Sequence, residues 1–346
     1  MRVLGRIREF FGAVPRASVR REARRFLAAT ADCRQTQWQT LRRLLALNAD
    51  SRFSRRHGLD SVRTAGDFRR RLPIGDFEQF RPHIERIKQG DAAALLGSRN
   101  PLLMFSLSSG TTAESKFIPI TRPFLDDYRR GWQIWGIGAL DDHPGINSRH
   151  IVQLSGDHDR SRTEGGTPCG NISGLVSAMQ KRIVRTMYTL PASVGKLADH
   201  DARLYVTLRL ALADPDAGMI ITANPSTLIH LAERADRDRE RLIRDIHDGT
   251  LSHLLSRDAE SSERSAPLRV AANLRLRPDP RRARELERLV ERTGRLRPSG
   301  YWPGLQLVAV WTGGSCAAYL PTLRTWFGNV PVRDHGLSAS EGRMTI

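Results

Sequence analysis

Apolar residues near the start of the chain recur three and four positions apart, which is the spacing of one face of an α-helix. The pattern runs through "FLAATADCRQTQWQTLRRLLALN" at 26–48 and returns in "DFEQFRPHIERIKQG" at 76–90. In the second stretch Asp76 can cap the first turn and Gly90 can end the helix. No strand pattern is evident before residue 90. The N-terminal segment is therefore predicted to be helical.

After residue 100, short apolar runs of strand length alternate with helical patterns. "PLLMFSL" at 101–107 is the first such run, and further strands are predicted at 150–154, 218–223, 305–311 and 329–334. Helices are predicted at 121–139, 171–190, 225–248 and 279–294, and the polar stretch 257–269 is predicted to be a flexible insertion. This alternation indicates an α/β fold, with mixed β-sheets flanked by helices.

The formal net charge of +18 changes this picture little, because the arginines are spread along the whole chain and often stand beside acidic residues. Proteins that bind nucleic acids instead cluster their cations, commonly with aromatic side chains between them. No apolar run approaches the roughly 20 residues of a membrane-spanning helix. We therefore predict no nucleic-acid partner and no membrane partner. The three cysteines, Cys33, Cys169 and Cys316, are widely spaced and indicate neither a disulfide framework nor a zinc site, so the expected compartment is the cytoplasm.

One loop combines short hydroxyl side chains with a rare cation. Lysine occurs only at Lys88, Lys116, Lys181 and Lys196, so nearly every positive charge in the chain is an arginine. Lys116 ends the loop "SSGTTAESK", in which Gly110 allows close backbone approach and Ser108, Ser109, Thr111 and Thr112 supply donors. Such a loop can bind a polyphosphate, and Lys116 would contribute the charge. An ordinary turn rich in Ser and Thr has the same composition, and the GxxxxGK[ST] pattern is absent.

The loop also resembles a known signature. "SSGTTAESK" is similar to the phosphate-binding motif of the adenylate-forming enzymes, the superfamily of acyl-CoA synthetases and luciferases, although Ala113 and Ser115 replace a Gly and a Pro of that motif. "FSLSSGTTAESKFIPIT" is closer to one branch, the Gretchen Hagen acyl-acid amido synthetases, named for auxin-responsive plant genes and also found in bacteria. The similarity covers about residues 30–346, including "NPSTLIHLAERADRDRERLIRDIHDGTL" and "YWPGLQLVAVWTGGSCAAYLPTLRTWF".

The resemblance assigns a second nucleotide motif near the end of the chain. In "HGLSASEG" it places Leu337, Ser338, Ala339 and Ser340 along the adenine and α-phosphate, and Glu341 as the ligand of Mg2+. Leu337 stands where the family has a stacking aromatic residue, so another side chain such as His335 would have to pack on the adenine. The "TGGS" turn resembles the family's adenine-binding turn, through Gly313, Gly314 and Ser315. Lys116 and Glu341 are thereby implied as catalytic residues, with ATP and Mg2+ as cofactors.

The fold implied is the large N-terminal domain of an adenylate-forming enzyme. Residues 1–30 are expected to form a basic helix or tail, and 31–346 an incomplete nucleotide- and acyl-binding domain that lacks the family's mobile C-terminal domain. The implied activity is a ligase that adenylates a small carboxylic acid with ATP and transfers the acyl group to an amine such as an amino acid. Two alternatives remain open: an acyl-CoA ligase of the same superfamily, and a truncated, non-catalytic nucleotide-binding remnant.

Overall fold

A helical arm forms the N-terminal part of the computed structural model, which describes residues 13–108, 115–252, 274 and 276–346. The arm consists of α2 (Ala13–Ala29), α3 (Cys33–Leu47), α4 (Arg52–Arg56), α5 (Ala65–Arg71) and α6 (Phe77–Lys88). Asp76 caps α6 by accepting a hydrogen bond from the Glu78 N–H, which confirms the predicted cap. The helical stretch predicted at 26–48 is interrupted by a 3-10 turn at Thr30–Asp32. The division predicted at residue 30 stays a prediction.

The first sheet has four strands and is mixed. Its strands are β1 (Leu102–Ser108), β2 (Lys116–Thr121), β4 (Ser161–Arg162) and β5 (Pro168–Gly170), in the order β2-β1-β5-β4. β1 is antiparallel to β2 and parallel to β5. Alternate side chains face opposite ways along a strand, so Phe105 packs with Ile84 and Ile87 of α6 while Met104 packs on the other face.

The second sheet is parallel throughout. Its strands are β3 (His150–Gln153), β6 (Ala217–Ile221), β7 (Leu307–Val310) and β8 (Val332–Asp334), in the order β3-β6-β7-β8. The strands lie side by side in the same order in which they occur along the chain. Each connection between neighbouring strands therefore crosses the sheet in the same direction. Because such crossovers are right-handed, their helices all cover the same face of the sheet. The crossover helices are α10 (His200–Ala213), α11 (Pro225–Arg237), α12 (Arg239–Asp248), α15 (Pro280–Thr293), α16 (Pro298–Tyr301) and α17 (Leu320–Phe327). The largest hydrophobic cluster lies between these helices and the sheet.

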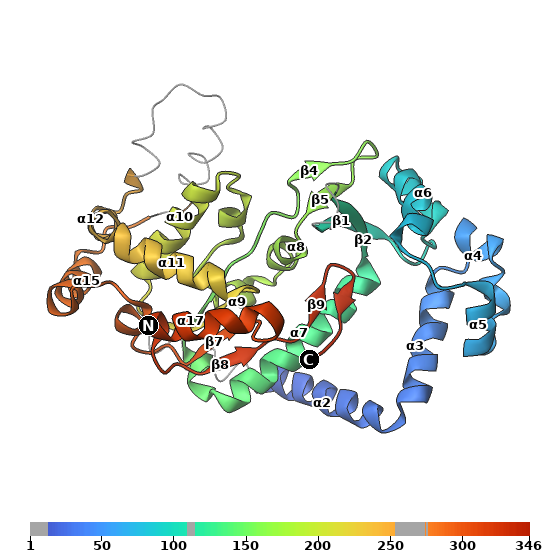
Figure 1. Ribbon diagram of the computed structural model, residues 1–346, viewed down its shortest axis with the longest axis horizontal. Coiled ribbons are helices and arrows are strands. Elements are labelled where there is room, and N and C mark those ends of the chain that lie inside the picture. The colour runs from blue at the N-terminus through green and yellow to red at the C-terminus, as the bar shows by residue number, and fades with distance from the viewer. Residues whose placement is uncertain (1–12, 109–114, 253–273, 275) are drawn as a thin grey trace.

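Helix α7 (Arg122–Asp142) connects the two sheets. Near its start Leu125 packs under the first sheet, and farther along Trp135 and Ala139 pack against the second sheet, on the face that the crossover helices leave uncovered. α2 runs beside α7, where Arg20 pairs with Asp141 and Arg130 pairs with Glu22 at 3.3 Å (Figure 1). One helix therefore supports both sheets and the N-terminal arm.

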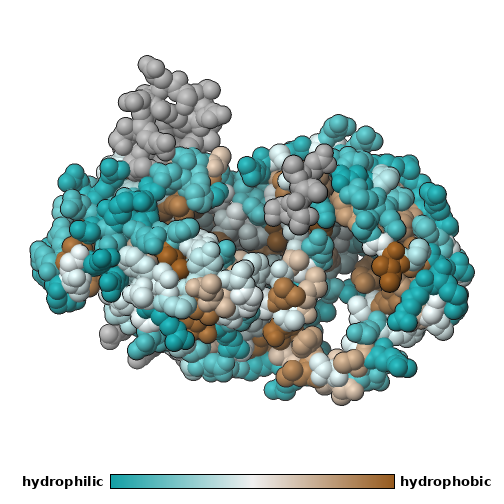
Figure 2. All heavy atoms as spheres, in the orientation of Figure 1, coloured by the Kyte–Doolittle hydropathy of each residue, from teal (hydrophilic) through white to brown (hydrophobic). Residues whose placement is uncertain are grey.

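The chain ends in a hairpin of β9 (Ser338–Ala339) and β10 (Gly342–Arg343), which packs on α7. Figure 1 shows this hairpin beside α7, extending from the second sheet toward β2. The surface drawn in Figure 2 is mainly hydrophilic, with hydrophobic side chains gathered in a central band over α7 and the hairpin. Leu337 and Met344, at the ends of the hairpin, are 61% and 55% exposed.

The predicted fold class is confirmed, but two of the predicted helices are wrong in extent. The stretch 171–190 contains only α8 (Ile172–Ala178) and α9 (Arg182–Arg185), because the Arg185 guanidinium donates to the carbonyl oxygens of Ala178 and Gln180 and so caps the end of α8. The stretch 225–248 divides into α11 and α12 at Asp238, which accepts from Arg234. The insertion predicted at 257–269 lies outside the described residues.

No helix in the described part of the chain combines the length and the apolar character that spanning a bilayer requires.

Candidate nucleotide site

The β1–β2 pair positions the first nucleotide motif. Ser108 ends β1 and lies opposite Lys116, the first residue of β2, in the antiparallel register. The chain therefore leaves the sheet at Ser108 and returns to it at the neighbouring position, Lys116. The remaining predicted donors belong to the connection between these two residues. Four of those donors, Ser109, Gly110, Thr111 and Thr112, lie outside the described residues. The structure therefore describes the two ends of the predicted phosphate loop.

Lys116 lies against the start of α6, a contact that sequence analysis did not predict. Its Nζ is 5.4 Å from the centre of the Phe77 ring, and the Arg81 guanidinium lies 5.5 Å from the same ring. Hydrogen bonds from Arg81 lower the pKa of the Glu78 carboxyl, and the charge of Lys116 lowers it further. Lys116 makes no ion pair within 4.0 Å among the described residues, so its charge is available to a ligand. The sequence carried no motif for Phe77 or Glu78 beyond their place in a capped helix.

The second motif forms the hairpin at the end of the described chain. Ser338 and Ala339 make up β9, and Ser340 and Glu341 form the turn before β10. The Glu341 side chain is exposed and has no hydrogen-bond or ion-pair partner in the described part of the protein. A carboxylate at a hairpin tip, free of any cation, can bind a hard metal ion together with phosphate oxygens. The described residues contain no group of three or more potential metal ligands, so such an ion would depend on the nucleotide for its other ligands.

Arg343 anchors the hairpin to α7. Its Nη2 donates to the carbonyl oxygen of His335, and its guanidinium lies 4.4 Å from the centre of the Trp132 ring. Gly131 allows this approach, since a Cβ there would lie 2.8 Å from Cδ of Arg343. Burial lowers the pKa of Arg343, and its Nε and Nη1 have no hydrogen-bond partner among the described atoms. The hairpin is thus held by a cation on an aromatic face.

Hydrogen bonds join the glycine turn to the residues just before the hairpin. Asp334 accepts hydrogen bonds from the Thr312 N–H at 2.6 Å, from the Thr312 hydroxyl at 2.7 Å and from the Gly336 N–H at 2.6 Å. Burial by itself would raise the pKa of Asp334, but these hydrogen bonds outweigh it and lower the pKa. The three residues that follow Thr312 are exposed, namely Gly313, Gly314 and Ser315. Gly314 has φ +56°, a conformation that favours glycine.

His335 does not offer a face for adenine. It is only 3% exposed, and its ring lies 5.3 Å from Trp132, 6.5 Å from Trp135 and 5.5 Å from Trp311. Its Nε2 lies 3.2 Å from the Thr222 carbonyl oxygen. Burial lowers the pKa of His335, so the ring is neutral near pH 7. His335 therefore belongs to the packing between α7 and the second sheet, and the suggestion that it stacks on adenine is wrong for this structure.

The predicted residues fall into two groups joined by α7. β2, which begins at Lys116, leads directly into α7, and the hairpin that carries Glu341 packs on the same helix (Figure 1). The glycine turn joins the hairpin through Thr312 and Asp334. Lys116 and Glu341, both of which the structure describes, make no ion pair with each other. A triphosphate has the charge that complements Lys116, whereas Glu341 could approach it only through a bound metal cation.

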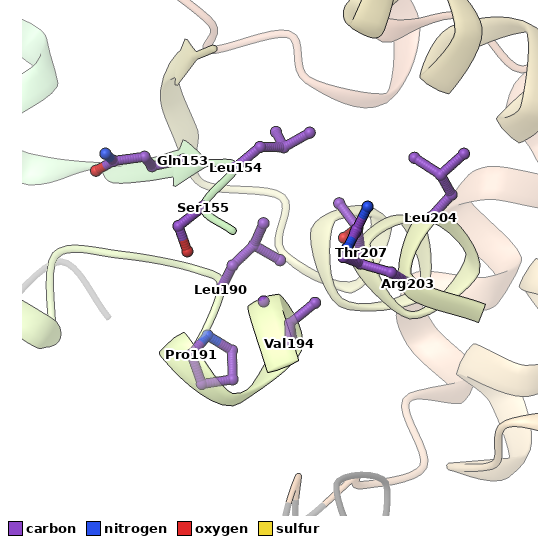
Figure 3. A pocket seen from close by; sticks show the side chains of 10 residues that line it. Gln153, Leu154, Ser155, Leu190, Pro191, Val194, Arg203, Leu204 and Thr207 are labelled. Atoms are coloured by element: carbon purple, nitrogen blue, oxygen red, sulfur yellow. The ribbon is translucent and has the colours of Figure 1, made fainter. Parts of the chain in front are cut away.

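A small pocket lies at the carboxyl end of β3, outside this arrangement (Figure 3). None of the residues predicted for the nucleotide that lie in the described part of the chain lines it. The pocket is formed by Gln153, Leu154, Ser155, Leu190, Pro191, Val194, Gly195, Arg203, Leu204 and Thr207. The sequence offered only a weak signal for it, a predicted strand at 150–154 that is followed by Ser155 and Gly156.

Comparison with known proteins decides the family. The model of the GH3 family N-terminal domain matches residues 22–332 of this chain. The chain belongs to the GH3 family. This membership confirms the resemblance of the chain to the Gretchen Hagen branch, and the match includes the whole of the first sheet, α7 and the first three strands of the second sheet.

Relatives in the GH3 family are longer than this chain. It is 25% identical over 333 residues to jasmonoyl–L-amino acid synthetase JAR4 of Nicotiana attenuata, covering 92% of this chain and 55% of that protein. It is 28% identical over 320 residues to indole-3-acetic acid-amido synthetase GH3.6 of Arabidopsis thaliana, covering 88% of this chain and 49% of that protein. The chain thus spans about half the length of the curated relatives it matches.

A solved structure shares the fold. The AtGH3.15 acyl acid amido synthetase in complex with 2,4-DB superposes with a TM-score of 0.73 at 19% identity, over 89% of this chain and 53% of that one. At this level of identity the superposition establishes that the two proteins share the same fold. It does not establish the chemistry of this chain.

Proposed function

We propose that the protein acts as an ATP-dependent acyl-acid amido synthetase. Its substrates would be a small carboxylic acid and an amine such as an amino acid, and its product an amide. The observation that carries the proposal is the match to the GH3 N-terminal domain over 22–332, in a chain whose two nucleotide motifs meet the same helix, α7. The named relatives, which conjugate jasmonate or indole-3-acetic acid to amino acids, support the reaction class.

The chemistry explains why ATP is required. A carboxylate is a poor acyl donor because its leaving group would be oxide, and adenylation replaces that leaving group with AMP. The reaction must bring a carboxylate to a triphosphate, two anions, so its barrier is lowered by cations and N–H donors placed around the phosphates. When bound, Mg2+ would supply part of that neutralising charge.

The residues of this chain fit these roles. We infer that Lys116 contacts the phosphates and stabilises the departing pyrophosphate, since its ammonium makes no ion pair within 4.0 Å among the described residues. Ser108, together with Ser109, Gly110, Thr111 and Thr112 of the connection, would donate hydrogen bonds to the phosphates. Glu341 would hold Mg2+. The turn at Gly313, Gly314 and Ser315 and the hairpin residues Leu337, Ser338, Ala339 and Ser340 would border the adenosine.

The residue Leu337 indicates that adenine would be contacted differently here than in the family. It occupies the position of the family's stacking aromatic residue and is 61% exposed, so it can cover one face of an adenine by apolar contact but without ring stacking. His335 is not available for this role. We therefore expect adenine specificity to depend on hydrogen bonds from the backbone of the glycine turn more than on stacking.

The test is acid-dependent exchange of pyrophosphate into ATP, measured over a panel of aromatic and aliphatic acids, with mass spectrometry of the products formed with amino acids. We expect exchange with at least one acid and an amide product. Lys116→Met should reduce exchange by about a hundredfold or more, in line with the loss of one group that stabilises transition-state charge. Lys181→Met, which removes an exposed lysine away from the motifs, is the matched control.

The other outcomes overturn the proposal in different ways. A thioester formed with coenzyme A, and no amide, would identify an acyl-CoA ligase. Binding of ATP without exchange for any acid would identify a nucleotide-binding remnant. A Lys116→Met protein that exchanges at the same rate as Lys181→Met would remove the assigned role of Lys116.

A further inference from the structure

The pocket at the carboxyl end of β3 is built from three separate segments. These are the end of β3 with the residues that follow it, the 3-10 turn Ala192–Lys196 with the residues before it, and α10 between Arg203 and Thr207 (Figure 3). The carboxyl ends of parallel strands are the common place for ligands in α/β sheets, because loops diverge there. Those residues assigned above to ATP and Mg2+ that the structure describes do not line the pocket. A ligand bound here would not contact them.

Three polar side chains of the pocket have no hydrogen-bond partner in the part of the chain that the structure describes. Thr207 is 4% exposed, and its hydroxyl forms no hydrogen bond with any described residue. The same holds, within the described ranges, for the side chains of Gln153 and Ser155. The Thr207 hydroxyl is accessible to solvent, and the side chains of Gln153 and Ser155 beside it are half-buried. These three groups can therefore hydrogen-bond to a small ligand without giving up a contact within the described chain.

Arg203 determines the charge of the occupant. Its Nη1 donates to the Leu197 carbonyl oxygen at 3.2 Å, and its Nη2 contacts His200 Nδ1 at 3.0 Å. Neither partner is a carboxylate, and Arg203 makes no ion pair with any carboxylate of the described chain. A guanidinium has five N–H donors, so donors remain for another acceptor. A cation at a pocket without its own carboxylate favours an anionic ligand.

The walls and size determine the rest of the ligand. Leu154, Leu190, Pro191, Val194 and Leu204 make half of the lining apolar. The cavity volume is about 40 Å³, enough for a few atoms of the size of water oxygen and too small for a nucleotide or an aromatic acid. A phosphate would need donors on most sides, which these walls do not offer. A carboxylate with a short alkyl tail matches the single cation, the hydroxyls and the apolar walls.

The pocket is held in shape by backbone contact. A Cβ at Gly195 would lie 2.8 Å from the Gly156 carbonyl oxygen and 2.9 Å from the Ser155 carbonyl oxygen, so the turn packs directly on the segment after β3. We propose that this pocket is a binding site for a short-chain aliphatic carboxylate, with Arg203 and Thr207 contacting the carboxylate and Leu190 and Leu204 the alkyl tail. This site goes beyond the amido synthetase function and does not depend on it.

The experiment compares propionate with propionamide by isothermal titration of the whole chain, at a constant ionic strength of about 0.15 M that screens non-specific binding to a cationic protein. We expect propionate to bind at least about tenfold more tightly, because only the carboxylate can pair with Arg203. Arg203→Gln should weaken propionate binding about tenfold and leave propionamide unchanged. Leu190→Trp, which fills the pocket without removing a charge, should abolish binding of both.

Arg281→Gln is the matched control, because Arg281 has a side chain that is 80% exposed on α15, away from the pocket. It should bind propionate as the unmodified protein does. Circular dichroism establishes that each variant is folded, and Leu190→Trp keeps the test decisive if Arg203→Gln does not fold. Equal binding of propionate and propionamide, no binding of propionate, or unchanged propionate binding by Leu190→Trp would each overturn the proposal.

Discussion

Lys116, at the end of the predicted phosphate loop, lies with its ammonium 5.4 Å from the centre of the Phe77 ring at the start of α6. Phe77 belongs to α6 and Lys116 to β2, and the whole of β1 and the following loop lie between these elements in the sequence. The contact positions the ammonium in the absence of a nucleotide. A cation on an aromatic face can still donate hydrogen bonds to phosphate, so the ring would hold Lys116 in place without competing for it.

Replacing this ring should weaken the binding of ATP. Phe77→Leu keeps an apolar side chain but removes the cation–π contact, which contributes about 0.5–1 kcal/mol at a partly exposed site, so the Kd for ATP should rise about two- to fivefold. The measurement is a double-mutant cycle with Lys116→Met, in which Phe77→Leu should have no further effect. Phe80→Leu, on the same helix but packed on Phe53, is the control. Additive effects of Phe77→Leu and Lys116→Met would contradict the coupling.

Arg343 should control the order of the hairpin. Arg343→Met retains the length of the side chain but removes the donor to the His335 carbonyl and the cation over Trp132. We expect a loss of about 1–2 kcal/mol in the free energy of unfolding, and faster hydrogen exchange at residues 338–343 than in the unmodified protein. Denaturant unfolding and exchange mass spectrometry measure the two effects. Exchange at the hairpin that stays as slow as in the unmodified protein would show that other contacts hold it.

The buried His335 should make the protein less stable in mild acid. Burial lowers its pKa, so as the pH falls through about 6.5 the unfolded chain takes up a proton that the folded ring does not. Stability should therefore fall by about 1.4 kcal/mol for each pH unit below 6.5, until the folded pKa is reached. The check is the melting temperature between pH 7.5 and 5.5. His335→Gln should flatten this dependence relative to the unmodified protein, and an unchanged slope would assign it to other groups.

Two glycines in helices should respond oppositely to alanine. At Gly174 in α8 a Cβ would lie 2.7 Å from the His158 backbone nitrogen and closer still to the Gly156 carbonyl oxygen. At Gly136 in α7 it would meet nothing within 4 Å. Gly174→Ala should therefore destabilise by about 1–3 kcal/mol through overpacking, and Gly136→Ala should stabilise by about 0.5–1 kcal/mol through helix propensity. Urea unfolding compares them, and a neutral Gly174→Ala would mean that the segment after β3 shifts to make room.

Local patterns in the sequence were sufficient for most elements. The helix at 279–294 appears as Pro280–Thr293, ended by Gly294 in the left-handed conformation, and the strands at 150–154 and 218–223 appear within one or two residues. These elements carry their signals in residues adjacent along the chain, such as caps, glycines and strings of apolar residues. Where a side chain from beyond the helix ends it, as Arg185 does for α8, the predicted extent was wrong.

The candidate site divides in the same way. The motif residues from Ser108 to Lys116 and from Gly313 to Glu341 were predicted from the sequence because they resemble, in the same order along the chain, the family's nucleotide motifs. The Phe77 contact of Lys116, the burial of His335 among tryptophans and the pocket lined by Thr207 and Arg203 could not be predicted in this way. Each of these joins residues far apart in the sequence, and only the packing of α6, α7 and α10 against the two sheets brings them together.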